Sequence, residues 1–80
     1  MFLGGEKMRK EEVIARKKNA VVIQFNDDPA KGTVGYYGEI YQKGIYTGNT
    51  CVHGDTELAI STVLDGAKLF FGDEKYEIVR

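Results

Sequence analysis

The hydrophobic and polar positions between residues 20 and 53 form patterns typical of β-strands. Residues 20–25 read AVVIQF, a β-branched and aromatic run that predicts a strand. Val21, Ile23 and Phe25 would share one face of this strand. Val22 on the other face indicates cover from both sides, as in a central strand that carries the core.

A hairpin is predicted after the turn-forming residues 26–32, NDDPAKG. One strand is expected over residues 33–41 and its partner over residues 45–53, with a tight reversal at residues 42–44. The period of two places Val34, Tyr36, Gly38 and Ile40 on one face of the first of these strands, and Thr33, Gly35, Tyr37, Glu39 and Tyr41 on the other.

Helices are predicted in two segments of the chain. Residues 8–18 are good helix formers without Gly or Pro. Residues 56–65 have apolar positions at helical spacing, with Gly66 as the residue just past the helix end. A strand interpretation competes here, because Asp65-Gly66 also suits a turn between residues 62–64 and 68–70. Residues 67–71 and 75–79 would form a closing hairpin.

These elements predict an α+β domain. It would have an N-terminal helix, a mainly antiparallel sheet of four or five strands, and a second short helix before a C-terminal hairpin. The alternative is a small β-barrel with one helix. We expect one domain over residues 8–80, with residues 1–7 as a disordered or mis-annotated extension.

The segment before Met8 suggests a particular origin. Residues 3–8, LGGEKM, can be encoded by TTA GGA GGA GAA AAA ATG, which contains a ribosome-binding element before the Met8 codon. One hypothesis is that translation begins at Met8 in a bacterium or its phage. The other is that Gly4-Gly5 is merely a flexible tip.

Size and composition limit how such a domain can be stabilised. The chain has 80 residues, of which 42% are hydrophobic and 29% charged, with one cysteine and one histidine. This is the balance of a folded protein with a thin core. Neither an internal disulfide nor a tetrahedral zinc site can form from Cys51 and His53, so we expect a homo-oligomer.

Other classes of function find little support in the sequence. The net charge of -1 excludes a surface that is basic throughout. We expect no membrane association, a cytoplasmic location, no cofactor and no bound metal. A Cys51–His53 nucleophilic pair would need a third residue to orient it and an oxyanion site, and the sequence has no signature for either. The glycines lack the spacing of a phosphate-binding loop. We therefore expect no enzymatic activity.

Two groups of residues remain as candidate binding sites. The basic residues of the first predicted helix suggest a nucleic-acid contact, although Glu12 and Arg16 also form an ordinary helix pair. Tyrosines are enriched at interfaces, and the glycine-rich hairpin cannot bury all of its own. The candidate partner-binding residues are Tyr37, Glu39, Tyr41, Lys43 and Tyr46, and the candidate nucleic-acid-binding residues are Arg9, Lys10, Arg16, Lys17 and Lys18.

The favoured function is that of a small non-enzymatic binding protein. We expect a phage or mobile-element accessory protein that binds or inhibits a host protein or a small-molecule signal. The alternative is a dimeric nucleic-acid-binding regulator that uses the basic helix and stacks tyrosines on bases.

Overall fold

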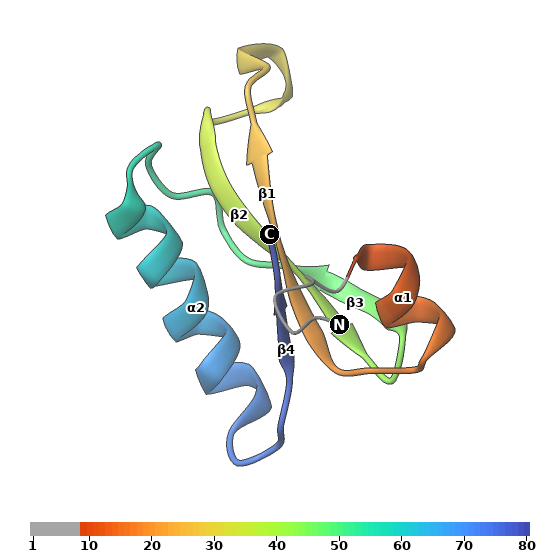
Figure 1. The fold of residues 1–80 in the computed structure, drawn as a ribbon. Coiled ribbons are helices and arrows are strands. Elements are labelled where there is room, and N and C mark those ends of the chain that lie inside the picture. The colour runs from red at the N-terminus through yellow and green to blue at the C-terminus, as the bar shows by residue number, and fades with distance from the viewer. Residues whose placement is uncertain (1–8) are drawn as a thin grey trace, which may run out of the picture.

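The fold is a mixed four-stranded sheet with one helix on each face. The structure is a computed structural model that describes residues 9–80, and Figure 1 shows the arrangement of its elements. In chain order these are α1 (Lys10–Ala15), β1 (Ala20–Asn26), the 3-10 helix η1 (Pro29–Lys31), β2 (Gly35–Gln42), β3 (Ile45–Asn49), α2 (Glu57–Phe71) and β4 (Glu77–Val79). The α+β class is confirmed, and the sheet does not close into a barrel.

The strands lie in the order β3-β2-β1-β4. β1 pairs antiparallel with β2, with Val21 opposite Ile40 and Ile23 opposite Gly38. It pairs parallel with β4, where Ile78 is the partner of Val21. The predicted central position of residues 20–25 is therefore confirmed.

Each face of the sheet has its own apolar cluster. Under α2 the buried residues are Val21, Ile23, Ile40, Ile60, Val63, Ala67 and Phe71. On the opposite face they are Val13 of α1 with Ala20, Val22, Tyr41 and Val79. The predicted alternation along β2 is confirmed, because Tyr36 packs on the first cluster and Tyr41 belongs to the second.

Phe25 departs from its expected role in the core. It shares a face with Val21 and Ile23, but its side chain is 43% exposed. The cluster under α2 extends along β1 only as far as Ile23. Beyond that point Phe25 packs edge-on against the Tyr36 ring, with centroids 4.8 Å apart.

The hairpin strands are shorter than predicted at their outer ends. β2 begins at Gly35 rather than residue 33, and β3 ends at Asn49 rather than residue 53. The chain after β3 nevertheless stays beside β2. The Thr50 N–H donates to Gly38 O at 2.7 Å, and the His53 N–H donates to Tyr36 O at 2.8 Å.

The predicted ending of α2 and the closing hairpin are wrong. α2 continues through Gly66 to Phe71, because Ala67 and Phe71 are buried against the sheet on the same helical face as Ile60 and Val63. Residues 67–71 are therefore helix. Residues 77–79 pair with β1 in parallel rather than with a neighbouring hairpin strand.

α1 is a single short helix that ends where the backbone of Lys17 takes a φ of 54°. The predicted helix over residues 8–18 is confirmed only for its middle. Met8, the proposed start codon and the predicted extension over residues 1–7 lie outside the described residues. No helix within residues 9–80 has the length and apolar character needed to cross a membrane.

Candidate functional site

Within residues 9–80, the sheet face opposite α2 is divided into a half covered by α1 and an open half. α1 lies over the β1 end that contains Ala20 and Val22, where Val13 is completely buried. α1 has only six residues, so it does not reach the other end of the face (Figure 1). Along β1 and β2, Gln24 and Tyr37 face each other in this open half and are only half-buried.

The covered half holds an ion pair under α1. The Lys10 ammonium lies 3.2 Å from Glu39 Oε1 and 5.9 Å from the centre of the Tyr41 ring. Oε1 is shielded from solvent, and within the described residues the Lys10 ammonium is its ion-pair partner. Hydrogen bonding and charge from Glu39, with a further contribution from Tyr41, raise the pKa of Lys10 above its usual 10.5.

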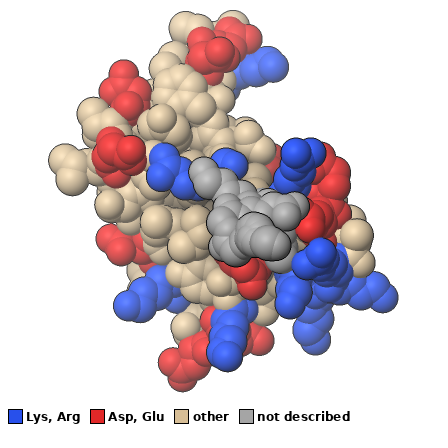
Figure 2. Space-filling model, viewed as in Figure 1, with Lys and Arg blue, Asp and Glu red and all other residues tan. Residues whose placement is uncertain are grey.

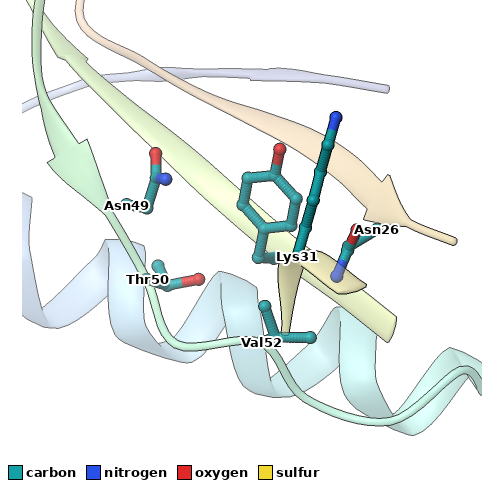
Figure 3. Close-up of a pocket in the computed structure, with 6 residues that line it drawn as sticks. Asn26, Lys31, Asn49, Thr50 and Val52 are labelled. Atoms are coloured by element: carbon teal, nitrogen blue, oxygen red, sulfur yellow. The ribbon is translucent and has the colours of Figure 1, made fainter. Parts of the chain in front are cut away.

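The open half contains a shallow pocket of about 230 Å³. It lies between the end of β1, the first part of β2 and the end of β3, together with the segments that follow β1 and β3 (Figure 3). Its lining residues are Asn26, Lys31, Tyr37, Asn49, Thr50 and Val52.

The loop between β1 and β2 is built to hold Lys31 at this pocket. Asn26 Nδ2 donates to Thr33 O at 2.8 Å, while its Oδ1 accepts from the Asp28 N–H at 3.2 Å. Asp28 Oδ1 in turn caps η1 by accepting from the Ala30 N–H at 3.0 Å. The turn signal of residues 26–32 thus becomes an ordered loop that carries Lys31.

The far wall of the pocket is fixed by Thr50 and Asn49. Thr50 Oγ1 accepts from the Gly38 N–H at 2.8 Å and donates to Cys51 O at 3.1 Å. Asn49 Oδ1 accepts a hydrogen bond of 2.6 Å from the Tyr46 hydroxyl.

The structure separates the five candidate partner-binding residues. Tyr37 is half-buried and lines the pocket. Glu39 and Tyr41 belong to the covered half, and Tyr41 is only 4% exposed, so it offers a partner little surface. Tyr46 on the edge strand β3 is 51% exposed and packs edge-on against Tyr41, with ring centroids 5.7 Å apart. Lys43 is exposed in the β2–β3 turn.

Most of the pocket residues carry no functional signal in the sequence. The residue pattern indicates Lys31 and Asn26 only as parts of a turn, and Asn49, Thr50 and Val52 only as positions on a strand. The asparagine and aspartates in residues 26–28 did indicate local backbone hydrogen bonding. No local pattern indicates that this turn and the end of β3 lie at one pocket, because that proximity arises from sheet pairing.

The candidate nucleic-acid-binding residues fall into two groups, those in ion pairs and those exposed on the surface. Lys10 points to Glu39, and Arg16 pairs with Glu12 at 3.2 Å. Lys17 and Lys18 are exposed beside the β2–β3 turn, where the Gly44 N–H donates to Lys18 O at 2.9 Å. Figure 2 shows a group of Lys and Arg side chains at this end of the molecule, at the lower right of the view, while others are spread over the rest of the visible face. Arg9, at the start of α1, is exposed.

Cys51 and His53 lie in the segment that follows β3, where Cys51 is an exposed free thiol and His53 is half-buried. Within residues 9–80, no three His, Cys, Asp or Glu side chains come together as metal ligands would.

Taken together, the open half offers an aromatic ring, a lysine and a small pocket, an arrangement suited to reversible binding. When the chain is compared with known proteins, no family model, no curated protein and no solved structure matches it.

Proposed function

We propose that this protein is a non-enzymatic binding protein and that the open half of the sheet, centred on Tyr37, is its binding surface. The observation that carries the proposal is the incomplete cover of this face by α1. Because α1 has only six residues and packs over Ala20 and Val22, a half-buried tyrosine and a pocket beside it are left uncovered by the described residues. Tyrosine gives a large contact area at low entropic cost, which favours such positions as binding hot spots.

The partner that we propose is a host protein or a small-molecule signal, and the protein itself an accessory protein of a phage or mobile element. The support for a phage or mobile-element origin lies in the purine-rich codons that residues 3–7 allow.

The test compares the wild-type protein with two variants in capture from lysates of candidate bacterial hosts, followed by titration with the purified partner. Tyr37→Ala should weaken binding by about 1–2 kcal/mol or more, as expected for a binding hot spot. Leu69→Ala is the matched control, because its exposed side chain lies on α2, away from the open half. Equal binding by wild-type protein and Tyr37→Ala would contradict the proposal.

Nucleic-acid binding is the second candidate, favoured by the position of Lys43 beside Lys17 and Lys18 at the α1 end of the molecule. A phosphate-binding surface of this kind should lose affinity steeply with salt. Titration of a short duplex at two salt concentrations, with the triple variant Lys17→Gln, Lys18→Gln, Lys43→Gln as comparison, separates this candidate from the first.

We also propose self-association through the edge strand β3. Ile45 and Tyr46 are 69% and 51% exposed on this strand, which within residues 9–80 has a sheet partner on one side only. Exposed apolar edge strands favour pairing with another chain.

A further inference from the structure

The pocket of the open half has acceptor groups that are already engaged. Asn26 Oδ1, Thr50 Oγ1 and Asn49 Oδ1 each accept a hydrogen bond from within the protein, at 3.2, 2.8 and 2.6 Å respectively. Both hydrogen-bonding groups of the Asn26 amide and the proton of the Thr50 hydroxyl are also used. These side chains therefore build the walls of the pocket.

The hydrogen-bond donors of the pocket, in contrast, are available to a ligand. Within residues 9–80, the Lys31 ammonium, the Tyr37 hydroxyl and the Asn49 Nδ2 make no hydrogen bond to another side chain or to the backbone. They come from η1, β2 and β3, and Figure 3 shows Lys31 and Asn49 projecting from the same side of the sheet. A ligand in this pocket would meet donors on several sides.

The positive charge of Lys31 is not neutralised by an ion pair within the described residues. Asp27 and Asp28 share its loop, but neither carboxylate lies within 4.0 Å of the ammonium, and Asp28 Oδ1 is held by the Ala30 N–H. A ligand with negative charge would therefore gain charge-assisted hydrogen bonds here.

The apolar surface and the volume of the pocket limit the size and character of the rest of the ligand. Tyr37 and Val52 contribute apolar surface. The volume of about 230 Å³ is below the roughly 300–1,000 Å³ of pockets for drug-sized molecules. The pocket thus suits a small group with a flat or apolar body.

We propose that the pocket binds an oxyanion, a carboxylate or phosphate group, attached to a small apolar body. This inference rests on the proposed binding role of the open half and adds the chemistry of what binds there. The Lys31 ammonium would meet the charge, the Tyr37 hydroxyl and Asn49 amide would donate to its oxygens, and the apolar body would lie against Val52.

The test is a titration of isotopically labelled protein followed by amide NMR at neutral pH and low salt. Benzoate, benzyl alcohol and benzylamine present the same ring with a negative, a neutral and a positive group, and inorganic phosphate presents an oxyanion without a ring. Benzoate should shift the amides of Lys31, Tyr37 and Asn49 in a saturable manner, and more strongly than the other two ring compounds. Phosphate should shift the same amides more weakly.

Two variants test the donors directly. Lys31→Gln should weaken benzoate binding roughly tenfold, the size expected for loss of a charge-assisted hydrogen bond. Tyr37→Phe removes only the hydroxyl and should weaken it by a smaller factor. Lys18→Gln is the matched control, because this exposed lysine lies at the α1 end of the molecule. Lys31 is itself exposed, so its replacement should leave the fold intact.

The inference is overturned if benzylamine binds as well as benzoate, if Lys31→Gln retains the wild-type affinity, or if none of the four probes shifts the pocket amides. Phosphate shifts confined to Lys17, Lys18 and Lys43 would likewise overturn it. The experiments distinguish failure of the oxyanion inference from failure of the proposed binding function. Benzyl alcohol or benzylamine bound at Tyr37 would leave the binding surface standing with the wrong ligand chemistry. Benzoate bound through Lys31, with partner capture insensitive to Tyr37→Ala, would remove the proposed function alone.

Discussion

The backbone N–H of Lys43 donates a hydrogen bond of 2.9 Å to the side-chain oxygen of Asn19. The same side chain donates from Nδ2 to Lys75 O at 3.3 Å, and the backbone oxygen of Asn19 accepts from the Glu77 N–H at 2.8 Å. One residue between α1 and β1 therefore joins the β2–β3 turn to the segment that leads into β4.

Replacing Asn19 with Ala should destabilise the fold by about 1–2 kcal/mol, because two hydrogen bonds between distant segments are lost. Urea unfolding measures this change. Asn49→Ala is the control, since its only side-chain bond within the described residues is to the Tyr46 hydroxyl, and it should stay within roughly 0.5 kcal/mol. Equal effects of the two replacements would show that the Asn19 connections contribute little.

Two glycines should respond in opposite directions to replacement by alanine. A Cβ on Gly38 would lie 2.7 Å from Val63 Cγ1 and 2.8 Å from Val21 Cγ2, so Gly38→Ala should cost about 1–3 kcal/mol through overpacking. Gly66 lies inside α2, where the nearest atom to a new Cβ is Thr50 Cγ2 at 3.9 Å. Gly66→Ala should stabilise the protein by up to about 1 kcal/mol through helix propensity. Thermal unfolding of both variants checks the pair, and a loss of stability in Gly66→Ala would contradict the helical position of this residue.

The ion pair between Lys10 and Glu39 should make stability depend on alkaline pH. The folded-state pKa of Lys10 is raised above 10.5, so the folded chain binds this proton more tightly than the unfolded chain. Its stabilisation is therefore complete below the unfolded-state pKa near 10.5, and is lost as pH rises through the higher folded-state pKa. Unfolding free energies between pH 8 and about 12 should show Lys10→Met less stable than wild type at pH 8, with the difference shrinking at high pH. The double variant Lys10→Met, Glu39→Gln should lack this pH dependence. A constant difference between Lys10→Met and wild type would contradict the assignment.

Neighbouring tyrosines of β2 should differ in their effect on folding. Tyr36 packs against the cluster under α2 and against the Phe25 ring, so Tyr36→Ala should cost about 2–4 kcal/mol through the loss of buried surface. Tyr37 points to the open half, so Tyr37→Ala should cost less than about 1 kcal/mol. Chemical denaturation distinguishes them. Similar losses would mean that Tyr37 is structural and would weaken the binding proposal.

Self-association through β3 should be sensitive to one charge on the edge strand. Light scattering at high micromolar concentration should report a dimer or larger species for the wild-type protein. Ile45→Lys should convert it to a monomer without unfolding, because charged residues on an exposed edge oppose strand pairing. Leu58→Lys on α2, also exposed, is the control and should remain associated. A monomeric wild-type protein would refute self-association.

The residue pattern by itself indicated β1, β2 and β3 and the faces of β1 and β2, whereas the strand predicted over residues 67–71 is part of a helix. The β-branched run of residues 20–25 and the period of two along β2 place Val21, Ile40 and Tyr36 correctly, because burial on a pleated sheet requires alternation that local sequence records. The same holds for the turn at residues 26–32. For α2 the pattern favoured a helix but also allowed a strand, and the structure shows the helix. Its end was misplaced, because glycine and aspartate signal a helix terminus locally, while burial of Ala67 and Phe71 under a distant sheet overrides that signal.

Only the tertiary structure decided which helices, strands and loops are neighbours in space. The parallel pairing of β4 with β1, the placement of α1 over one half of a face, and the meeting of Lys31 with Asn49 all join segments far apart in the chain. Such contacts depend on chain closure and on the complementarity of whole elements, which no local period encodes. The alternation along β2 could place Tyr37 on a face, but the length of α1 and the pairing of three strands left that part of the face open.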